Sequence, residues 1–539
     1  MQTHCGSAAP LFLGFDSSTQ TLKALLMDAD LNVVREATVN FDRDLPEFKT
    51  QGGVQRHADG LTVTSPPLLW VAALDLLLEK MKGAGGDFAR IAAVSGSGQQ
   101  HGSVWLGRRA HAALRGLSAR RSLREQLAGV FSVGASPVWM DSSTTRQCRA
   151  LEKALGGAQA VAELTGSRAC ERFTGNQIAK ISQTQPRAYA ETERIALVSS
   201  FVASLLIGDY APIDAADGSG MNLMNIRTKR WDKAALDATA PGLAKRLGAI
   251  VPSHTVVGAI HPYYARRYGF ARGCLVAAFS GDNPCSLAGL RLQRPGDVAL
   301  SLGTSDTLFG SLTQPKPSGS EGHVFASPVA PRAYMAMICR KNGSLTREQT
   351  RNAVAGRSWQ TFARLMAETP AGNGGQIGFH LQEPEITPPI LKSGIWRFDA
   401  RGKPVRRFAA SVEARAVLES QFLCLRLHGA SIGLKPAGIL ATGGASVNPA
   451  VLRVIADVFG VPVYVGEQPN SATLGAAYRA LHGWLCRQRR RFVPFAEVVA
   501  AAPPFRQAVA PDPRAHAVYT RMLPRYAALE RKVRRETGG

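Results

Sequence analysis

The sequence lacks the features of a membrane-spanning chain, a cysteine metal site or a secretory leader. Its 539 residues contain no run of about 20 apolar residues, the length that a helix needs to cross a bilayer. The eight cysteines are scattered and form no C-x-x-C pair, so neither a zinc site nor a thioredoxin-like site is expected. The N-terminus has no basic segment followed by an apolar core. We therefore expect free thiols and a cytoplasmic protein.

Acidic residues are too few to balance the basic ones. There are 40 Asp and Glu against 64 Lys and Arg, which leaves a net charge of +24. Such a charge could serve nucleic acid, an acidic membrane or anionic substrates. The densest basic segments, 108–124 and 487–491, contain no aromatic residues that could stack on bases. We interpret both as solvated surface and expect neither nucleic acid nor a membrane as a partner, although the charge leaves nucleic-acid binding as an alternative.

The first element of the chain reads as a strand, a tight turn and a second strand. Apolar residues 11–15 lead into Asp16, the hydroxyl side chains of Ser18 and Thr19 follow, and residues 21–28 form a second, mostly apolar stretch. Hydroxyl and N–H groups at such a turn suit phosphate oxygens. Asp16 could hold Mg²⁺ through water. The alternative is an ordinary hairpin turn with side-chain caps.

Residues 297–309 nearly repeat this pattern. An apolar strand again leads into a glycine, Gly303, and then into the hydroxyls of Thr304 and Ser305. The repeat is too long for a solenoid, since one copy falls in each half of the chain. With 539 residues, two or more domains are expected in any case. We predict two similar domains that face each other, each with one phosphate-binding turn.

A third element, residues 438–446, runs from a short strand into Gly443, Gly444 and Ala445. Apolar residues at helical spacing predict a helix over 449–459, with Ser446 or Asn448 as its N-cap. Glycines allow a flat ring or a phosphate to approach the backbone closely. The alternative is the glycine turn that joins strand to helix in any α/β protein.

A Gly-Asp-Asn segment in the middle of the chain could supply a base. The apolar run 274–279 predicts a strand, and Asp282 and Asn283 follow it in a glycine-containing turn. Asp282 could hold a hydroxyl group and take its proton. Such a turn can also be purely structural, because Asp and Asn hydrogen-bond their own backbone.

Taken together and in this order, the four elements resemble the carbohydrate kinases that include glycerol kinase, gluconokinase and xylulokinase. The resemblance covers residues 11–529. It implies an α/β fold of two actin-like (hexokinase-like, RNase H-like) ATPase domains facing a central cleft. We expect a sugar-binding domain over 11–285, a nucleotide-binding domain over 295–500, and a tail with a terminal helix over 501–539.

The resemblance also implies roles for the residues at the four elements. Asp282 would be the catalytic base, and Asp16 would hold Mg²⁺ through water. Trp359 would stack on adenine, although a half-buried core tryptophan is an equal alternative. The implied ATP contacts are Asp16, Ser18, Thr19, Gly303, Thr304, Trp359, Gly443, Gly444, Ala445 and Asn448.

The sugar is suggested by a loop after the strand expected at 91–95. His101 follows two glutamines and precedes a glycine, which is similar to the sugar-binding loop of xylulokinases and unlike that of glycerol kinases. Matched by position, His101, Arg172, Asp282 and Asn283 would bind the sugar. The resemblance thus implies transfer of the ATP γ-phosphoryl group to D-xylulose. Alternatives are a surface histidine and an Arg172 paired with Glu171.

Several segments have less certain meaning. Residues 137–144 are similar to a Trp-x-Asp segment beside the cleft of the family, or are a strand end with a helix cap. Residues 214–221 are interpreted as a structural loop. Helices are expected over 411–434, 471–485 and 519–532. Functional alternatives are a kinase for ribulose, gluconate or another polyol, and a non-catalytic ATP-binding protein. A monomer or homodimer is expected.

Overall fold

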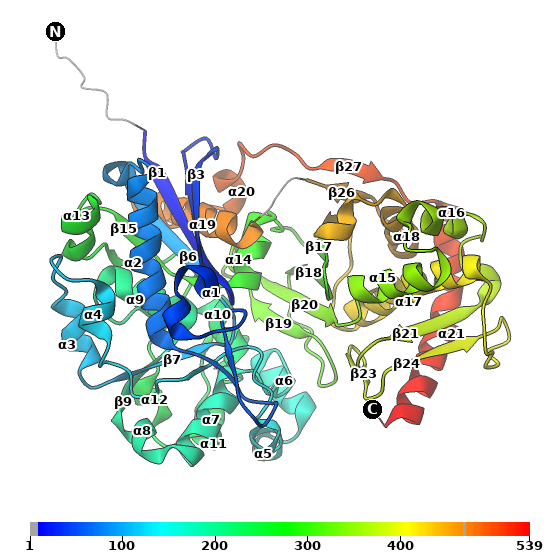
Figure 1. Cartoon of the computed structure of the whole chain (residues 1–539), viewed down its shortest axis with the longest axis horizontal. Coiled ribbons are helices and arrows are strands. Elements are labelled where there is room, and N and C mark those ends of the chain that lie inside the picture. Colours follow the sequence, from blue (N-terminus) through cyan, green and yellow to red (C-terminus); the bar gives the residue numbers. More distant parts are fainter. Residues whose placement is uncertain (1–8, 467–469, 539) are drawn as a thin grey trace, which may run out of the picture. The chain divides into compact units, whose positions relative to one another are not determined.

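The computed structural model describes residues 9–466 and 470–538. They form two compact units (Figure 1). The described part of unit 1 comprises residues 9–293, 325–333 and 470–502, and that of unit 2 comprises 294–324, 334–466 and 503–538. Unit 1 therefore contains a segment from near the end of the chain.

A mixed sheet forms the centre of unit 1, in the order β14-β15-β6-β1-β2-β3. β1 pairs antiparallel with β2, and β2 with β3, whereas β6 is parallel to β1 and β15 is parallel to β6. β14 closes the edge antiparallel to β15, and β16 pairs with β6 beyond the end of β15. The strands are β1 (Leu11–Ser17), β2 (Thr21–Met27), β3 (Val33–Asn40), β6 (Ile91–Gly98), β14 (Val256–Ala259), β15 (Leu275–Ala277) and β16 (Ser280–Gly281).

The sheet of unit 2 repeats this plan, in the order β19-β20-β18-β17-β25-β26-β27. β17 and β18 form the antiparallel hairpin, β25 is parallel to β17, β26 is parallel to β25, and β27 is antiparallel at the edge. The predicted duplication and the α/β class are thus confirmed. The strands are β17 (Asp297–Leu302), β18 (Asp306–Leu312), β19 (His323–Ala326), β20 (Tyr334–Arg340), β25 (Gly438–Thr442), β26 (Val463–Val465) and β27 (Arg506–Val509).

Helices cover both sheets. In unit 1, α2 is buried on most of its surface, because it packs on β2 and β3 and also against α4 and α9. The helices of unit 1 are α1 (Phe41–Asp44), α2 (Pro67–Gly83), α3 (Ala110–Arg115), α4 (Leu123–Leu127), α5 (Thr145–Leu155), α6 (Ala158–Thr165), α7 (Thr174–Thr184), α8 (Pro186–Glu191), α9 (Val198–Ile207), α10 (Ala215–Gly218), α11 (Lys233–Thr239), α12 (Leu243–Arg246), α13 (Pro262–Tyr268), α14 (Asp282–Gly289), α19 (Ser471–Arg489) and α20 (Phe495–Val498).

The helices of unit 2 confirm the expected ones with small changes at their ends. α18 spans the predicted residues, and Asn448 is its N-cap, since the Asn448 side chain accepts from Ala450 N. The terminal helix begins six residues earlier than expected, because Asp512 caps it and Pro513 opens it. These helices are α15 (Ser344–Val354), α16 (Trp359–Ala367), α17 (Ala410–Ser431), α18 (Pro449–Phe459) and α21 (Pro513–Thr537).

Short strands outside the two main sheets brace the connecting loops. In unit 1 they are β4 (Gln55–Arg56), β5 (Val63–Ser65), β7 (Ser103–Gly107), β8 (Ser136–Pro137), β9 (Thr192–Leu197), β10 (Ile213–Asp214), β11 (Met224–Asn225), β12 (Arg230–Trp231) and β13 (Ile250–Val251). In unit 2 they are β21 (Ile377–Leu381), β22 (Glu385–Ile386), β23 (Pro389–Ile390) and β24 (Gly394–Phe398).

Helix α19 belongs to unit 1 although it follows most of unit 2 in the sequence. It packs on β1, β6 and α14. Glycines make this contact close: a Cβ at Gly14 would lie 2.3 Å from Thr473 O, one at Gly289 would lie 2.0 Å from Ser471 O, and one at Gly475 would lie 1.8 Å from Cys285 O. The compact units therefore differ from the contiguous ranges 11–285, 295–500 and 501–539 that we expected, because packing partners decide the units.

Other expectations concerned cysteines and membranes. The seven cysteines in the described ranges are free, as expected, and Cys5 lies outside those ranges. Among the helices within 9–466 and 470–538, none combines the length and the apolar surface needed to span a bilayer.

Candidate active site

Asp282 is the first residue of α14, directly after β16. The Gly-Asp-Asn segment is therefore a junction between strand and helix, and the glycine turn expected from the sequence is not formed. Asp282 Oδ1 accepts from Asn283 N at 2.8 Å. The Asn283 side-chain amide donates to Gln100 Oε1 at 2.9 Å and to Asp282 Oδ1 at 3.2 Å. Because both bonds use Nδ2, the Asn283 Oδ1 atom remains available as an acceptor.

The carboxyl groups of Asp282 and Asp16 share one poorly solvated region of unit 1. Loss of solvation raises the pKa of Asp282 to about 7, and the negative charge of Asp16 adds to the rise. Burial also raises the pKa of Asp16, against the opposing effects of Ser97, which donates to Asp16 Oδ1 at 2.6 Å, and of Lys23. A carboxylate with a pKa near the working pH is suited to general-base chemistry.

His101 is held as a neutral acceptor. Its backbone is left-handed, with φ at 70°. The ring stacks on Phe173 at a centroid distance of 4.3 Å, and Nδ1 lies 2.9 Å from Gly220 O. Burial lowers the pKa of His101 to about 3, and the positive charge of Arg172 lowers it further. A neutral imidazole that meets a carbonyl through Nδ1 must carry its proton there, so Nε2 is an acceptor.

Glycine and threonine keep this ring in place. A Cβ at Gly220 would lie 2.8 Å from the His101 ring, so any larger residue would displace it. The Thr174 hydroxyl donates to His101 O at 2.9 Å. Arg172 precedes Phe173 and is half-buried. Unit 1 thus brings together the four residues expected at the sugar: His101 and Arg172 interact with each other, and Gln100 links the histidine loop to Asn283 and Asp282.

The first turn is tightly tied internally. The Ser18 hydroxyl donates to Thr21 O at 3.0 Å, and the Ser18 backbone N–H donates to the same oxygen. The Thr19 hydroxyl accepts from Trp139 Nε1 at 2.8 Å. These bonds fit the alternative of a capped hairpin, and they also fix the turn beside Asp16.

Trp139 and Asp141 of the Trp-x-Asp segment have different surroundings. Trp139 is 43% exposed and contacts the first turn. Asp141 is buried and accepts from Val63 N, from Ser143 N and from the Gln177 side chain. It ties loops together, as a structural residue does.

In unit 2, the second turn and the Gly443 turn lie side by side. A Cβ at Gly443 would lie 2.6 Å from Leu302 O, at the end of β17, and Gly443 has a φ of 83°. Gly444 has no atom within 4 Å of the position that a Cβ would take. Thr304 is exposed, and its carbonyl accepts from Gly343 N at 3.1 Å. Gly444 and the exposed Thr304 are therefore open to a ligand, whereas Gly443 packs closely against the end of β17.

Trp359 has an accessible ring. It is the first residue of α16 and is 38% exposed. The Arg351 guanidinium lies 4.5 Å from the centre of its ring, and Phe362 contacts it edge-on. Asn448 uses its side chain to cap α18, and Ala445 lies in the turn before it.

The sequence interpretation missed several residues that complete the site. Ser97 supports Asp16 from the end of β6, and Gln100 joins the histidine loop to Asn283. Asp217 is buried, and burial raises its pKa to about 8. Residues 214–221 were expected to be a loop but form β10 residue Asp214, α10 and a short 3-10 helix. A buried aspartate between small residues was the available signal.

Comparison with known proteins agrees with this geometry. Residues 133–289 match the N-terminal domain of the FGGY family of carbohydrate kinases, and residues 298–484 match its C-terminal domain. The xylulose kinase of Rattus norvegicus is 55% identical over 97% of this chain and 96% of its own. The xylulose kinase 2 of Arabidopsis thaliana is 49% identical over 90% of each chain.

The fold comparison points the same way. The crystal structure of the Rhodospirillum rubrum xylulose kinase superposes with a TM-score of 0.81 at 18% identity, covering 98% of this chain and 100% of that chain. At that identity, the likeness concerns the fold alone. The sequence matches show more: this chain belongs to the FGGY family of carbohydrate kinases.

Proposed function

We propose that the protein phosphorylates D-xylulose to D-xylulose 5-phosphate with ATP. The supporting observation is the pairing, in unit 1, of a carboxyl group with a pKa near 7 and hydroxyl acceptors of fixed orientation. The relatives that are 49–55% identical over at least 90% of the chain are xylulose kinases, which favours this sugar among those of the family.

Asp282 acts as the base in this proposal. The terminal hydroxyl oxygen of the sugar attacks the γ-phosphorus of ATP. Its O–H bond breaks, and the proton passes to the Asp282 carboxylate as the new O–P bond forms. The bond between the γ-phosphorus and the bridging oxygen breaks, and its electron pair leaves with ADP. Phosphoryl transfer depends mainly on positioning and charge stabilisation, so one base and well-placed donors suffice.

The sugar is oriented by groups whose donor and acceptor roles are already fixed. His101 Nε2 and Asn283 Oδ1 accept from sugar hydroxyls, because their partner atoms are engaged as donors. Arg172 donates to sugar oxygens. This division of roles distinguishes the acceptor hydroxyl from its neighbours.

The nucleotide is assigned to the glycine and hydroxyl turns of unit 2, where Gly303 and Thr304 would meet phosphate oxygens. The roles of Ser18 and Thr19 of unit 1 toward phosphate stay predictions from the sequence, since the N–H and hydroxyl groups of Ser18 both donate to Thr21 O. The backbone at Gly443, Gly444 and Ala445 takes the adenosine, with Asn448 shaping the turn and Trp359 offering an exposed ring. Mg²⁺ suits Asp16, a buried carboxylate oxygen donor, and when bound it would neutralise phosphate charge.

A panel of sugars in a coupled ADP-release assay tests the proposal. D-xylulose should give the highest kcat/KM, above D-ribulose, gluconate and glycerol. A higher value for another sugar would reassign the substrate within the family. No ADP release with any of them would favour a non-catalytic role. A cytoplasmic location and a monomeric or dimeric state stay predictions from the sequence.

A further inference from the structure

Asp217 is a buried acid that the reaction outlined above does not use. It lies in α10 and is 2% exposed. One carboxyl oxygen, Oδ2, accepts from the Ser199 hydroxyl at 2.5 Å. The other, Oδ1, makes no hydrogen bond within residues 9–466 and 470–538. A buried polar atom without a partner is costly, so such an atom calls for an explanation.

The unpartnered oxygen lies at the residue that precedes the base. A Cβ at Gly281 would lie 2.7 Å from Asp217 Oδ1 and 2.3 Å from Gln100 Cγ, so Asp217 and Gln100 flank the same small residue. Gln100 Nε2 is also buried without a partner among the described residues, while Gln100 Oε1 accepts from Asn283. The Gln100 side chain is close enough to act on Asp217, whose pKa it lowers.

The charges around Asp217 favour its neutral form. Burial raises its pKa to about 8, and the charges of Asp214 and Asp282 add to the rise, against the effects of Ser199 and Gln100. Asp214 itself forms a buried ion pair with Arg479 at 2.8 Å. Asp16 acts on Asp282 in turn. With a pKa raised to about 8, Asp217 favours its protonated form at neutral pH more than Asp282 does, whose pKa is raised to about 7.

We propose that Asp217 is a positioning residue that orients the Gln100 amide and thereby the Asn283 amide for the sugar. This inference rests on the proposed function. The proposal pairs the two buried atoms that are left without a partner, Asp217 Oδ1 and Gln100 Nε2, and a bond between them would keep Gln100 Oε1 directed at Asn283 Nδ2. Asn283 must then offer its own carbonyl oxygen to a sugar hydroxyl. Asp217 contacts no substrate, and it acts only through Gln100.

Ionisation of Asp217 at higher pH should lower the activity toward the sugar. When Asp217 ionises, a second negative charge stands beside Asp282 and close to the site of an anionic reaction. That charge disfavours the transition state through like-charge repulsion. The kcat/KM for the sugar should therefore fall above about pH 8, in addition to the fall below about pH 7 that protonation of Asp282 causes.

Three variants test the role of Asp217. D217A releases Gln100 and should raise the sugar KM roughly tenfold with little change in the ATP KM, since one buried hydrogen bond is lost. D217N keeps a carbonyl acceptor and cannot ionise, so it should recover most of the sugar affinity and lose the fall above pH 8.

D75N is the matched control: Asp75 is a buried acid with a raised pKa that accepts hydrogen bonds from Tyr263 and Tyr268, away from Gln100. It should change neither the sugar KM nor the pH profile.

Infrared spectroscopy measures whether the Asp217 carboxyl group is protonated, and it needs no substrate. The difference between wild type and D217N should show the C=O band of a protonated carboxyl group at pH 7, and the band should disappear as the pH passes about 8. Absence of this band at pH 7, or a D217N variant as impaired as D217A, would overturn the inference. Failure of the proposed function would show differently, as a wild-type protein without D-xylulose activity.

Discussion

Three acids near the proposed sugar site of unit 1 differ from the paired acids of unit 2, although Asp214 of unit 1 also forms a buried pair, with Arg479. In unit 2, Asp306 forms a doubly bonded pair with Arg347, at 2.6 and 3.0 Å, and Glu413 is paired with Arg397 and His380. In unit 1, Asp16, Asp217 and Asp282 form no ion pair with any described residue, and the pKa of each is raised. Asp16 lies near the end of the first strand of its hairpin, whereas Asp306 begins the second strand of its own, and burial raises the pKa of Asp306 as well.

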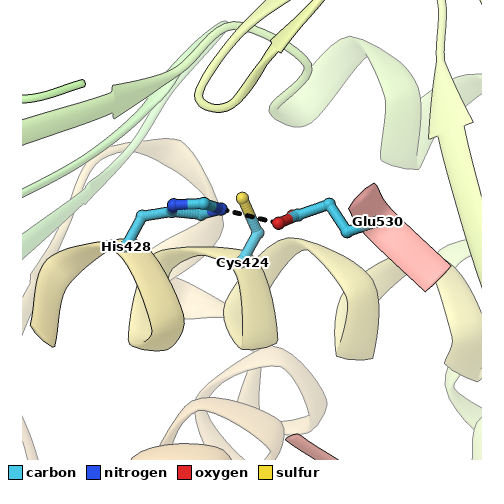
Figure 2. Close-up of side chains that lie close together, drawn as sticks. All are labelled: Cys424, His428 and Glu530. Carbon is cyan, nitrogen blue, oxygen red and sulfur yellow. Dashed lines mark hydrogen bonds and ion pairs between the residues drawn. The ribbon is translucent and has the colours of Figure 1, made fainter. Parts of the chain in front are cut away.

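The buried histidine of unit 2 extends the contrast. His428 lies between Glu321, at 2.6 Å from Nδ1, and Glu530, at 2.8 Å from Nε2. Figure 2 shows the contact between His428 and Glu530 with Cys424 beside it. Cys424 lies beside them and could complete a metal-binding set. However, the two glutamates outweigh burial and raise the pKa of His428 to about 9, and the Cys424 thiol donates to Thr387 O at 3.2 Å. The cluster is therefore a proton-bridged link between α17 and α21.

The two units differ in where an acidic side chain is kept without an ion-pair partner. Burying a charge without a partner lowers stability, so a chain under selection for stability alone would pair it. Unit 2 pairs its acids and gains fixed contacts between elements. Unit 1 leaves Asp16, Asp217 and Asp282 without an ion pair in the region where we propose that a proton moves and Mg²⁺ binds.

The largest effect should follow from removing the base. We expect D282N to lower kcat by roughly 10²–10⁴-fold while sugar binding is largely kept, because the amide cannot accept the hydroxyl proton. ADP release measures the rate, and calorimetry measures the binding of D-xylulose. D75N, which replaces another buried acid of unit 1, is the control. Near-full activity of D282N would remove Asp282 from this role.

Breaking a pair in unit 2 should affect stability and leave unit 1 intact. R347M leaves Asp306 buried and alone, so the free energy of unfolding should drop by about 3 kcal/mol or more. Urea unfolding followed by circular dichroism measures the loss. The double variant D306N/R347M should regain a large part of it, since no lone charge remains. A loss of unfolding free energy below about 1 kcal/mol in R347M would mean that the Asp306–Arg347 pair does not stabilise the fold.

The histidine cluster should make stability depend on pH. The pKa of His428 is raised in the folded state, so its stabilising effect is complete below pH 6.5 and is lost as the pH rises through about 9. We expect a decline on the order of 1–2 kcal/mol between pH 7 and pH 9.5. H428Q should lack this decline, whereas H111Q, which changes an exposed histidine, should keep it. An unchanged slope in H428Q would contradict the assignment.

The smallest effect concerns sugar affinity. H101A removes one neutral acceptor, so the KM for D-xylulose should rise roughly tenfold while the KM for ATP changes little. Steady-state kinetics with each substrate varied in turn measures both, and H111A provides the control. A raised KM for ATP alone would place His101 on the nucleotide side.

Much of the fold was predictable because its signals are local. The two hairpins, the strand before Gly443 and the helix capped by Asn448 are each encoded by apolar spacing and a capping residue. The placement of α19 was not predictable in the same way. Its partners are glycines nearly 200 or more residues away along the sequence, and no local pattern reports such a contact.

The site shows the same division. Roles for Asp282, His101, Arg172 and Asn283 could be predicted because they lie in motifs that resemble those of the family, and these roles stay predictions. Asp217 and Gln100 could not, because their meaning depends on which atoms are left without a partner after folding. Trp359 was left between two interpretations, and its 38% exposure leaves the ring accessible without deciding between them.

The close packing of α19 also constrains how the chain is made. Residues 471–489 fill the surface of β1, β6 and α14, and they leave the ribosome long after those elements. Until then, that face of unit 1 has no cover, and its apolar residues are open to other chains. Unit 1 can therefore complete its folding only near the end of synthesis, and a product that stops at residue 293 would lack one layer of its own core.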